Sequence, residues 1–149
     1  MGFHYEEFAA GASYRSPGRT IAEADILQFS GLTGDFNPLH TDEVFAAQSD
    51  FGGRIAHGPM LVGMAFGLVS RIGLFDGTVL ALLEIAWKFL APVMPGDTVH
   101  VRVEIMDTRP SRKPDRGVVD LAMEILNQRD ETVQSGRAKV LFKRREPLA

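Results

Sequence analysis

The second half of the chain alternates apolar and polar positions. Between residues 98 and 107, Val or Ile occupies every second position, and most positions between them are polar or charged. This period of two predicts a strand with one buried face and one solvated face. Similar apolar stretches, separated by short turn segments, predict four long strands: Thr78–Leu90, Thr98–Asp107, Val118–Asn127 and Thr132–Phe142. Strands this close in sequence pair most simply as one antiparallel sheet.

The first half of the chain predicts helices instead. Apolar residues spaced by four and then by three positions define one face of a helix: Ala22, Ile26 and Phe29. We expect this helix to run from Thr20 to about Gly31, because Thr20 and Glu23 have the spacing of a capping box and glycine commonly ends a helix. A short strand near Ala12–Arg15 is expected before it, and a second short helix, Asp42–Gln48 with Thr41 as its cap, after it.

A third predicted helix, from Pro59 to about Ile72, is apolar on nearly all sides. Proline suits the first helical position, and a helix of this composition must be buried on most sides. Two glycines one turn apart, Gly63 and Gly67, indicate close packing against a strand or a partner subunit. A buried helix combined with a long antiparallel sheet predicts an α+β fold in which the sheet wraps around the helix. Residues 1–149 are interpreted as a single domain.

Composition and charge narrow the classes of function. The chain has 149 residues, a net charge of −3 and an isoelectric point near 5.8, so no broad basic field indicates a nucleic-acid partner. It has no cysteine, which excludes disulfides, thiolate nucleophiles and cysteine metal sites. The longest apolar run, Pro59 to Val69, is shorter than the ~20 residues that cross a bilayer. With no secretory signal visible, we expect a cytoplasmic protein without membrane association.

A carboxylate and an imidazole, Asp35 and His40, lie five positions apart across a turn marked by Asn37-Pro38. Proline disfavours helical geometry at the preceding residue, so we expect residues 34 to 40 to be non-helical and the two side chains to converge. Two apolar neighbours are expected to shield the pair from water: Phe36 and Leu39. Such a pair could exchange protons with a substrate. For this spacing alone, the favoured alternative is a turn-capping aspartate beside a hydrogen-bonded structural histidine.

The dipeptide His57-Gly58 precedes the apolar helix. Pro59 has no N–H, so the Gly58 N–H is the donor available at the helix N-terminus, where the dipole favours negative charge. This is the outline of an oxyanion hole, and the alternative is an ordinary glycine before a helix. We expect His57 to be a structural hydrogen-bonding residue. A metal site formed by His40, Asp42 and His57 is another alternative, but their spacing does not favour it, and we predict neither a metal nor a cofactor.

Three segments resemble a known family. Residues Phe29 to His40, followed after five residues by Ala46, match the signature of the MaoC-like R-specific enoyl-CoA hydratases. The segments Ile55–Gly58 and Phe89–Asp97 are also similar to theirs. The resemblance favours the functional interpretation of the Asp35 segment over the structural one. It implies a hot-dog fold with the apolar helix inside the sheet, assembled as a homodimer or a higher assembly of dimers.

The resemblance also implies an activity. A hydro-lyase of this family adds water to a trans-2-enoyl thioester of coenzyme A or acyl carrier protein and gives the R-3-hydroxyacyl product. His40 would act as base, Asp35 would donate a proton to C2, the Gly58 N–H would bind the thioester oxygen, and Asn37 would brace the loop. Pro59, which some relatives lack, leaves acyl specificity open. A hot-dog thioesterase and a non-catalytic acyl-binding subunit remain alternatives.

Overall fold

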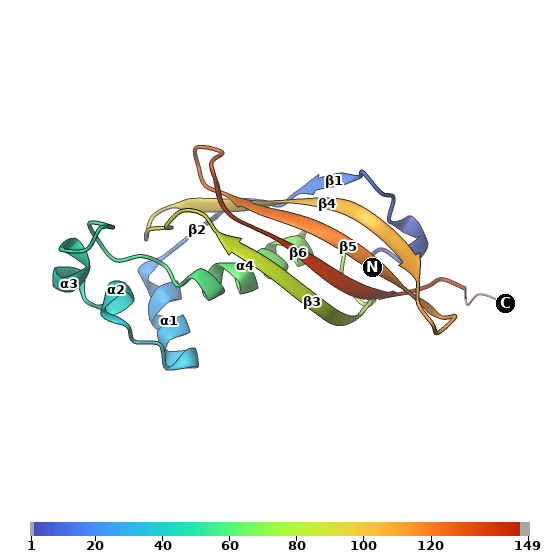
Figure 1. The fold of residues 1–149 in the computed structure, drawn as a ribbon, viewed down its shortest axis with the longest axis horizontal. Helices are drawn as coiled ribbons and strands as arrows, with labels where there is room; N and C mark the ends of the chain where they lie inside the picture. Colours follow the sequence, from blue (N-terminus) through green and yellow to red (C-terminus); the bar gives the residue numbers. More distant parts are fainter. Residues whose placement is uncertain (1, 147–149) are drawn as a thin grey trace.

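The computed structural model describes residues 2–146 and contains one long sheet, one long helix beneath it and a group of short helices at one end (Figure 1). The first and last described segments lie toward the opposite end of the sheet. The elements, in chain order, are a 3-10 helix η1 (Tyr5–Glu7), β1 (Ser13–Arg15), β2 (Arg19–Thr20), α1 (Glu23–Thr33), α2 (Pro38–Thr41), α3 (Glu43–Ala47), α4 (Gly58–Arg71), β3 (Val79–Phe89), β4 (Thr98–Pro110), β5 (Arg116–Leu126) and β6 (Thr132–Lys143).

The sheet has the strand order β1-β4-β5-β6-β3, and β2 pairs with the start of β4. All pairings are antiparallel, which confirms the four long strands and the short strand predicted from the sequence. The alternation on β4 is also confirmed, because Val99, Val101, Val103 and Ile105 are fully buried. Within residues 2–146, no helix combines the length and the apolar character needed to cross a membrane.

Helix α4 lies under the sheet, as the sequence predicts (Figure 1). Its buried residues recur every three or four positions and therefore form one face: Met60, Leu61, Ala65, Leu68 and Val69. This face joins the buried residues of β4, β5 and β6 in a single core. The apolar side chains of these elements leave water together, and that burial is the main source of the stability of the fold.

The prediction that α4 is buried on most sides is only partly correct. Gly63 and Gly67 are exposed, and a Cβ atom at either position would meet no atom within 4 Å. The expected close packing of these glycines against a strand is therefore wrong, and packing against a partner subunit remains a prediction. One stripe of the helix is exposed in the single chain, Pro59, Gly63, Gly67 and Arg71, whereas Met64 and Phe66 beside it are half-buried against the core.

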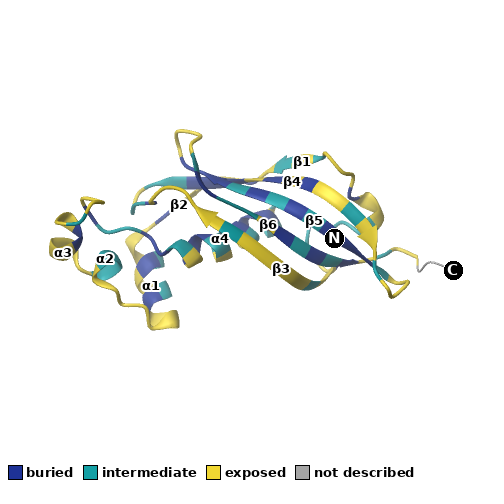
Figure 2. Cartoon of the chain, in the orientation of Figure 1, coloured by how far each residue is buried: buried dark blue, intermediate teal, exposed yellow. Residues whose placement is uncertain are grey.

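Strand β3 forms one edge of the sheet and is apolar but mostly exposed (Figure 2). Its large apolar residues are between 36% and 56% exposed: Val79, Leu80, Leu82, Leu83, Ile85 and Phe89. An edge strand of this length with apolar side chains normally has charged residues or a covering element to prevent pairing with another chain. Strand β3 has few charges, so its composition favours contact with a further chain.

Helix α1 (Glu23–Thr33) begins three residues later and ends two residues later than predicted. Thr20 lies in β2, and its hydroxyl pairs with that of Thr98 at 2.8 Å instead of capping a helix. The Asp25 carboxylate accepts a hydrogen bond from the Ala22 N–H at 2.9 Å. The acid that caps the helix is therefore Asp25, two residues after the predicted Glu23. The helix ends at Thr33, and the capping residue Gly34 has a φ of 78°, in the left-handed region that glycine adopts readily.

The predicted helix Asp42–Gln48 is shorter than expected and is capped differently. Asp42, not Thr41, caps α3 through a hydrogen bond from the Phe45 N–H, and the Thr41 hydroxyl bonds to backbone carbonyls. Helices α1, α2 and α3 together form a lobe beside the sheet (Figure 1). The Arg54 guanidinium ties this lobe together by pairing with Glu43 on α3 and Glu23 on α1.

His100 lies on the face of β4 predicted to be solvated, but its side chain is buried. Burial and the nearby charge of Arg15 lower its pKa below the ordinary value of 6.5, although Asp130 opposes the shift. The unfolded chain therefore binds a proton at this residue more readily than the folded chain does. Stability should accordingly fall as the pH drops below about 6.5.

We expect His100→Gln to reduce this loss of stability at acidic pH. The measurement is the free energy of unfolding in urea at pH 7.5, 6.5 and 5.5 for both chains. Equal pH dependence in both would contradict the assignment. His4→Gln, which alters a histidine near the other end of the sheet, serves as the control.

Candidate active site

Asp35 follows α1 directly and begins a tight turn. One oxygen of its carboxylate accepts a hydrogen bond from the Asn37 N–H at 3.2 Å, and the side chain is exposed. Asn37 in turn caps α2, because its side-chain oxygen accepts from the Leu39 N–H at 3.0 Å. The expectation of a non-helical segment from 34 to 40 is therefore only partly correct. Pro38 occupies the first position of α2, where its missing N–H costs nothing.

His40 lies in that short helix and is half-buried. Its Nδ1 is 2.8 Å from the carbonyl oxygen of Ile55. A carbonyl can only accept, so Nδ1 carries the proton and Nε2 of the neutral ring keeps a lone pair. Nε2 forms no hydrogen bond with any of residues 2–146, which leaves it able to act as a base.

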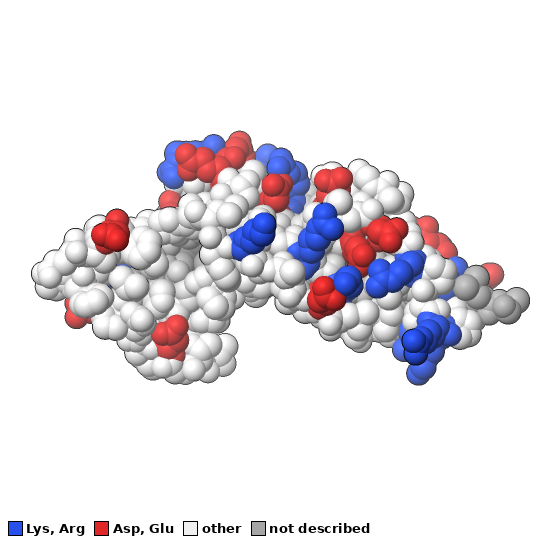
Figure 3. All heavy atoms as spheres, in the orientation of Figure 1, with Lys and Arg blue, Asp and Glu red and all other residues white. Residues whose placement is uncertain are grey.

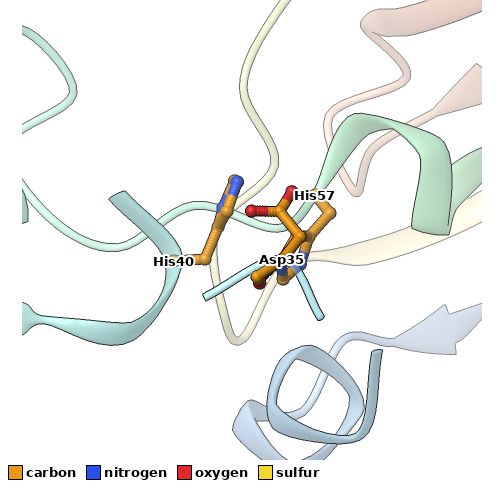
Figure 4. Close-up of side chains that lie close together, drawn as sticks. All are labelled: Asp35, His40 and His57. Carbon is orange, nitrogen blue, oxygen red and sulfur yellow. Dashed lines mark hydrogen bonds between the residues drawn. The ribbon is translucent and has the colours of Figure 1, made fainter. Parts of the chain in front are cut away.

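The two predicted side chains converge, as expected from the sequence. Asp35, His40 and His57 each place one oxygen or nitrogen atom within 4.8 Å of the others, and the Asp35 carboxylate points toward the His40 ring (Figure 4). Two hydrogen bonds of ~2.8 Å span up to ~5.6 Å, so one water molecule fits between a carboxylate and an imidazole at this separation. The predicted apolar shield is wrong for Phe36, which is 60% exposed in the single chain, whereas Leu39 is half-buried.

His57 is 1% exposed and lies against both predicted catalytic residues. Its Nε2 is 3.0 Å from the Asp35 carbonyl oxygen and 3.3 Å from the Ser30 hydroxyl. Its ring stacks on the His40 ring, with centroids 3.7 Å apart and planes 28° apart. These contacts confirm His57 as a structural hydrogen-bonding residue.

The structure groups Asp35, not Asp42, with the two histidines, so the metal trio considered from the sequence is wrong in that member. The geometry does not suit chelation by the observed trio. An imidazole lone pair lies in the plane of its ring, and the two stacked rings lie in nearly parallel planes. Their lone pairs therefore do not converge on one point, as metal ligands must.

Gly58 occupies the first position of α4, next to this cluster. Its N–H forms no hydrogen bond with any of residues 2–146, as is usual for the first turn of a helix. Its carbonyl accepts from the Gln134 side chain at 3.2 Å, and the Gln134 oxygen accepts from the Trp87 indole N–H at 2.9 Å. A Cβ atom at Gly58 would lie 2.8 Å from the Phe89 ring, so only glycine fits without a shift of that ring.

Sequence reasoning missed Gln134 and Trp87. They lie on β6 and β3, far from Gly58 in the chain, and only the pairing of these strands brings them to the helix N-terminus. The sequence contained no local signal for either residue beyond the single tryptophan.

A pocket of about 320 Å³ opens beside Gly58. Gln134 is its one polar side chain, and its walls are otherwise apolar: Phe51, Ile55, Leu61, Phe89, Leu90 and Val93. An apolar cavity of this size beside an unpaired backbone donor suits a ligand with a hydrocarbon portion and one carbonyl oxygen.

Residues 7–124 match the family model described as the MaoC like domain. The chain belongs to the MaoC-like family. The match covers most of the chain, including both segments that form the site.

Named relatives of this MaoC-like chain include enzymes. It is 34% identical over 134 residues to the 3-hydroxybutyryl-CoA dehydratase of Methylorubrum extorquens, covering 88% of this chain and 81% of that protein. It is 32% identical over 122 residues to the (R)-specific enoyl-CoA hydratase of Aeromonas caviae, covering 82% and 87%. It is also 40% identical over 100 residues to Protein MaoC of Klebsiella aerogenes, covering 67% of this chain and 30% of the much longer relative.

Solved structures agree with the fold. The MaoC-like dehydratase of Rhodospirillum rubrum superposes with a TM-score of 0.87 at 33% identity, covering 97% of this chain and 99% of that one. A Mycobacterium tuberculosis protein described as a double hotdog fold superposes with a TM-score of 0.86 at 20% identity, covering 99% of this MaoC-like chain and 46% of its own. The MaoC-like chain therefore has the hot-dog fold predicted from its sequence.

Proposed function

We propose that this MaoC-like protein adds water reversibly to a trans-2-enoyl thioester and forms the R-3-hydroxyacyl thioester. The observation that carries the proposal is the convergence of the Asp35 and His40 side chains, with ligand atoms within 4.8 Å of each other, near the helix start where the Gly58 N–H is unpaired. The named hydratase and dehydratase relatives support the same reaction type. Coenzyme A or acyl carrier protein would carry the acyl group.

The chemistry follows from these three groups. The bridging water attacks C3 while His40 Nε2 takes one of its protons, and the double bond shifts to give an enolate. The Gly58 N–H donates to the enolate oxygen, and one such donor is worth ~3 kcal/mol in known cases. Asp35 enters this step as the carboxylic acid and delivers its proton to C2, and the proton that His40 took from water then returns to the resulting carboxylate through a new water. Water is added across the double bond, and no other atoms are gained or lost.

Asn37 would have a bracing role in this mechanism, because its backbone N–H holds the Asp35 carboxylate and its side chain begins the helix of His40. The residues that bind the coenzyme A phosphates are not assigned. Arg54 is a poor choice for them, because its guanidinium is occupied by two carboxylates.

We further propose that the protein is a homodimer formed through β3 and the exposed side of α4. Both surfaces are unusually open for a monomer. Strand β3 is apolar and unpaired on one edge, and α4 is uncovered at Gly63 and Gly67. Close approach of two helices at such glycines would bury both surfaces together. Assemblies of such dimers would use other faces.

The test is an assay of the purified chain with crotonyl-CoA and longer enoyl-CoAs. We expect loss of the enoyl-thioester absorbance without release of thiol, and an R-configured product. A thiol-reactive dye monitors thioester cleavage cleanly, because the chain has no cysteine of its own. Thiol release would indicate a thioesterase, and thermal stabilisation by acyl-CoA without turnover at any chain length would indicate a binding subunit.

A further inference from the structure

We infer that His57 is a positioning residue that holds the proton-transfer pair and the oxyanion donor in one fixed arrangement. The inference rests on the proposed function and adds to it a residue that acts through its neighbours. His57 combines three contacts, each with a different part of the site.

The first contact fixes the Asp35 turn. The Asp35 carbonyl oxygen can only accept, so the His57 nitrogen 3.0 Å away, Nε2, carries the proton and donates it. Asp35 is otherwise on an exposed turn that follows a helix end, where the backbone has freedom to move. A hydrogen bond from a side chain that is 1% exposed removes much of that freedom.

The second contact fixes the ring of His40. The two rings stack at 3.7 Å between centroids, and Phe29 packs against the His57 ring at 4.9 Å. His40 is thus held on one side by the Ile55 carbonyl and on its face by His57. Because Nδ1 is bonded to the Ile55 carbonyl, the Nε2 atom on the other side of the His40 ring points away from that carbonyl.

The third contact is covalent. The peptide bond between His57 and Gly58 contains the N–H proposed to bind the thioester oxygen, so the orientation of this donor depends on where His57 is held. The His57 carbonyl also accepts from the Met60 N–H at 3.1 Å in the first turn of α4. A displacement of His57 would therefore move the donor and the proton-transfer pair relative to each other.

His57 does not take part in proton transfer itself in this arrangement. Its Nε2 proton is used by the Asp35 carbonyl, and its Nδ1 is buried without a hydrogen-bond partner in residues 2–146. A group that exchanges protons with a substrate must reach it, directly or through water. The structure gives His57 no such access.

Two substitutions separate the contributions of the hydrogen bond and the ring. His57→Gln keeps an N–H donor near Nε2 but removes the stacked ring, whereas His57→Phe keeps a ring and removes the donor. Misplacement of reacting groups by ~1 Å can cost ~100-fold, so we expect kcat to fall ~10-fold to ~100-fold in each variant. The KM should change little, because neither change alters the apolar pocket.

The second readout is the tautomeric state of the four histidines by nitrogen NMR. In the unmodified chain we expect His57 protonated at Nε2 and His40 at Nδ1, and in His57→Phe we expect the defined His40 tautomer to be lost. A residue that only supported the fold would not change the state of another ring. His4→Gln is the matched control, because His4 lies in the N-terminal segment away from the site.

The inference is overturned if folded His57→Gln and His57→Phe both keep the kcat of the unmodified chain, or if only KM changes. If neither variant folds, the tautomers measured in the unmodified chain still test the inference. A neutral His57 protonated at Nδ1 instead of Nε2 would overturn it, because Nε2 could then not donate to the Asp35 carbonyl. Failure of the proposed function gives a different result from failure of this inference. An unmodified chain without hydratase activity removes the function, while the tautomers still test the coupling of the three groups.

Discussion

Asp35→Asn should lower kcat for enoyl-CoA hydration by about 1,000-fold, within the range that general acid–base groups supply. Asparagine keeps an oxygen that can accept from the Asn37 N–H, so the turn should survive. It cannot accept or release the proton that the mechanism requires. His40→Ala should cause a loss of similar size, and the double variant should be little worse than either, because the two groups act as a unit.

The measurement is single-turnover hydration of crotonyl-CoA, with circular dichroism to show that each variant is folded. Asp50→Asn is the matched control, since Asp50 is an exposed aspartate that forms no hydrogen bond or ion pair with any of residues 2–146. Retention of more than a tenth of the normal rate in Asp35→Asn or His40→Ala would contradict their assignment as the catalytic pair.

Ile85→Lys should convert the protein from a dimer to a monomer. Ile85 lies in the middle of β3 and is 41% exposed in the single chain, so in the proposed dimer it lies within the interface. A lysine there would bury a charge without a partner, and natural proteins use lysine on edge strands to prevent such pairing. Activity should fall together with the dimer if the second chain completes the substrate site.

Light scattering after size-exclusion chromatography gives the mass directly. Met106→Lys is the control, because Met106 is 38% exposed but lies on β4, which β5 and β6 separate from β3 in the sheet. A dimer mass that persists in Leu82→Lys/Ile85→Lys at micromolar protein would rule out β3 as the interface. A monomeric unmodified chain would rule out the dimer altogether.

The strands were predictable because burial on one face of a sheet imposes a period of two, which β4 shows apart from the buried His100. The boundaries of α1 were less predictable, since two nearby acids, Glu23 and Asp25, can each fill the capping role. The spacing Thr20-x-x-Glu23 is present, but pairing of Thr20 with β4 competes with helix formation. Tertiary pairing of this kind is not visible in local spacing.

The local features of the site were likewise predictable, and its tertiary contacts were not. The Asp35–His40 pair and Gly58 could be identified in the sequence, because a turn, a proline and a helix start are all local features. The Ile55 carbonyl that sets the tautomer of His40, and the stacking of His57 on its ring, depend on where two loops meet. The exposure of Phe36 was mispredicted because an apolar residue beside a site is normally covered, and any cover comes from outside the single chain.

The proposed site combines residues from the helical lobe and from α4. In the view of Figure 3, lysines and arginines lie over the sheet interspersed with acids, and the helical lobe shows only a few acids on a largely uncharged surface. A hollow separates the lobe from the sheet in the same view. The lobe carries Asp35 and His40, and α4 carries Gly58, so the proposed reaction would take place where these two parts meet.

Trp87, the sole tryptophan, is linked to the Gly58 carbonyl by two successive hydrogen bonds through Gln134. Indole fluorescence responds to a change in the hydrogen bond of its N–H. The protein thus contains a single indole, coupled to the residue whose N–H is proposed to bind the thioester oxygen, and selective excitation of this indole can report occupancy of the site without any added label.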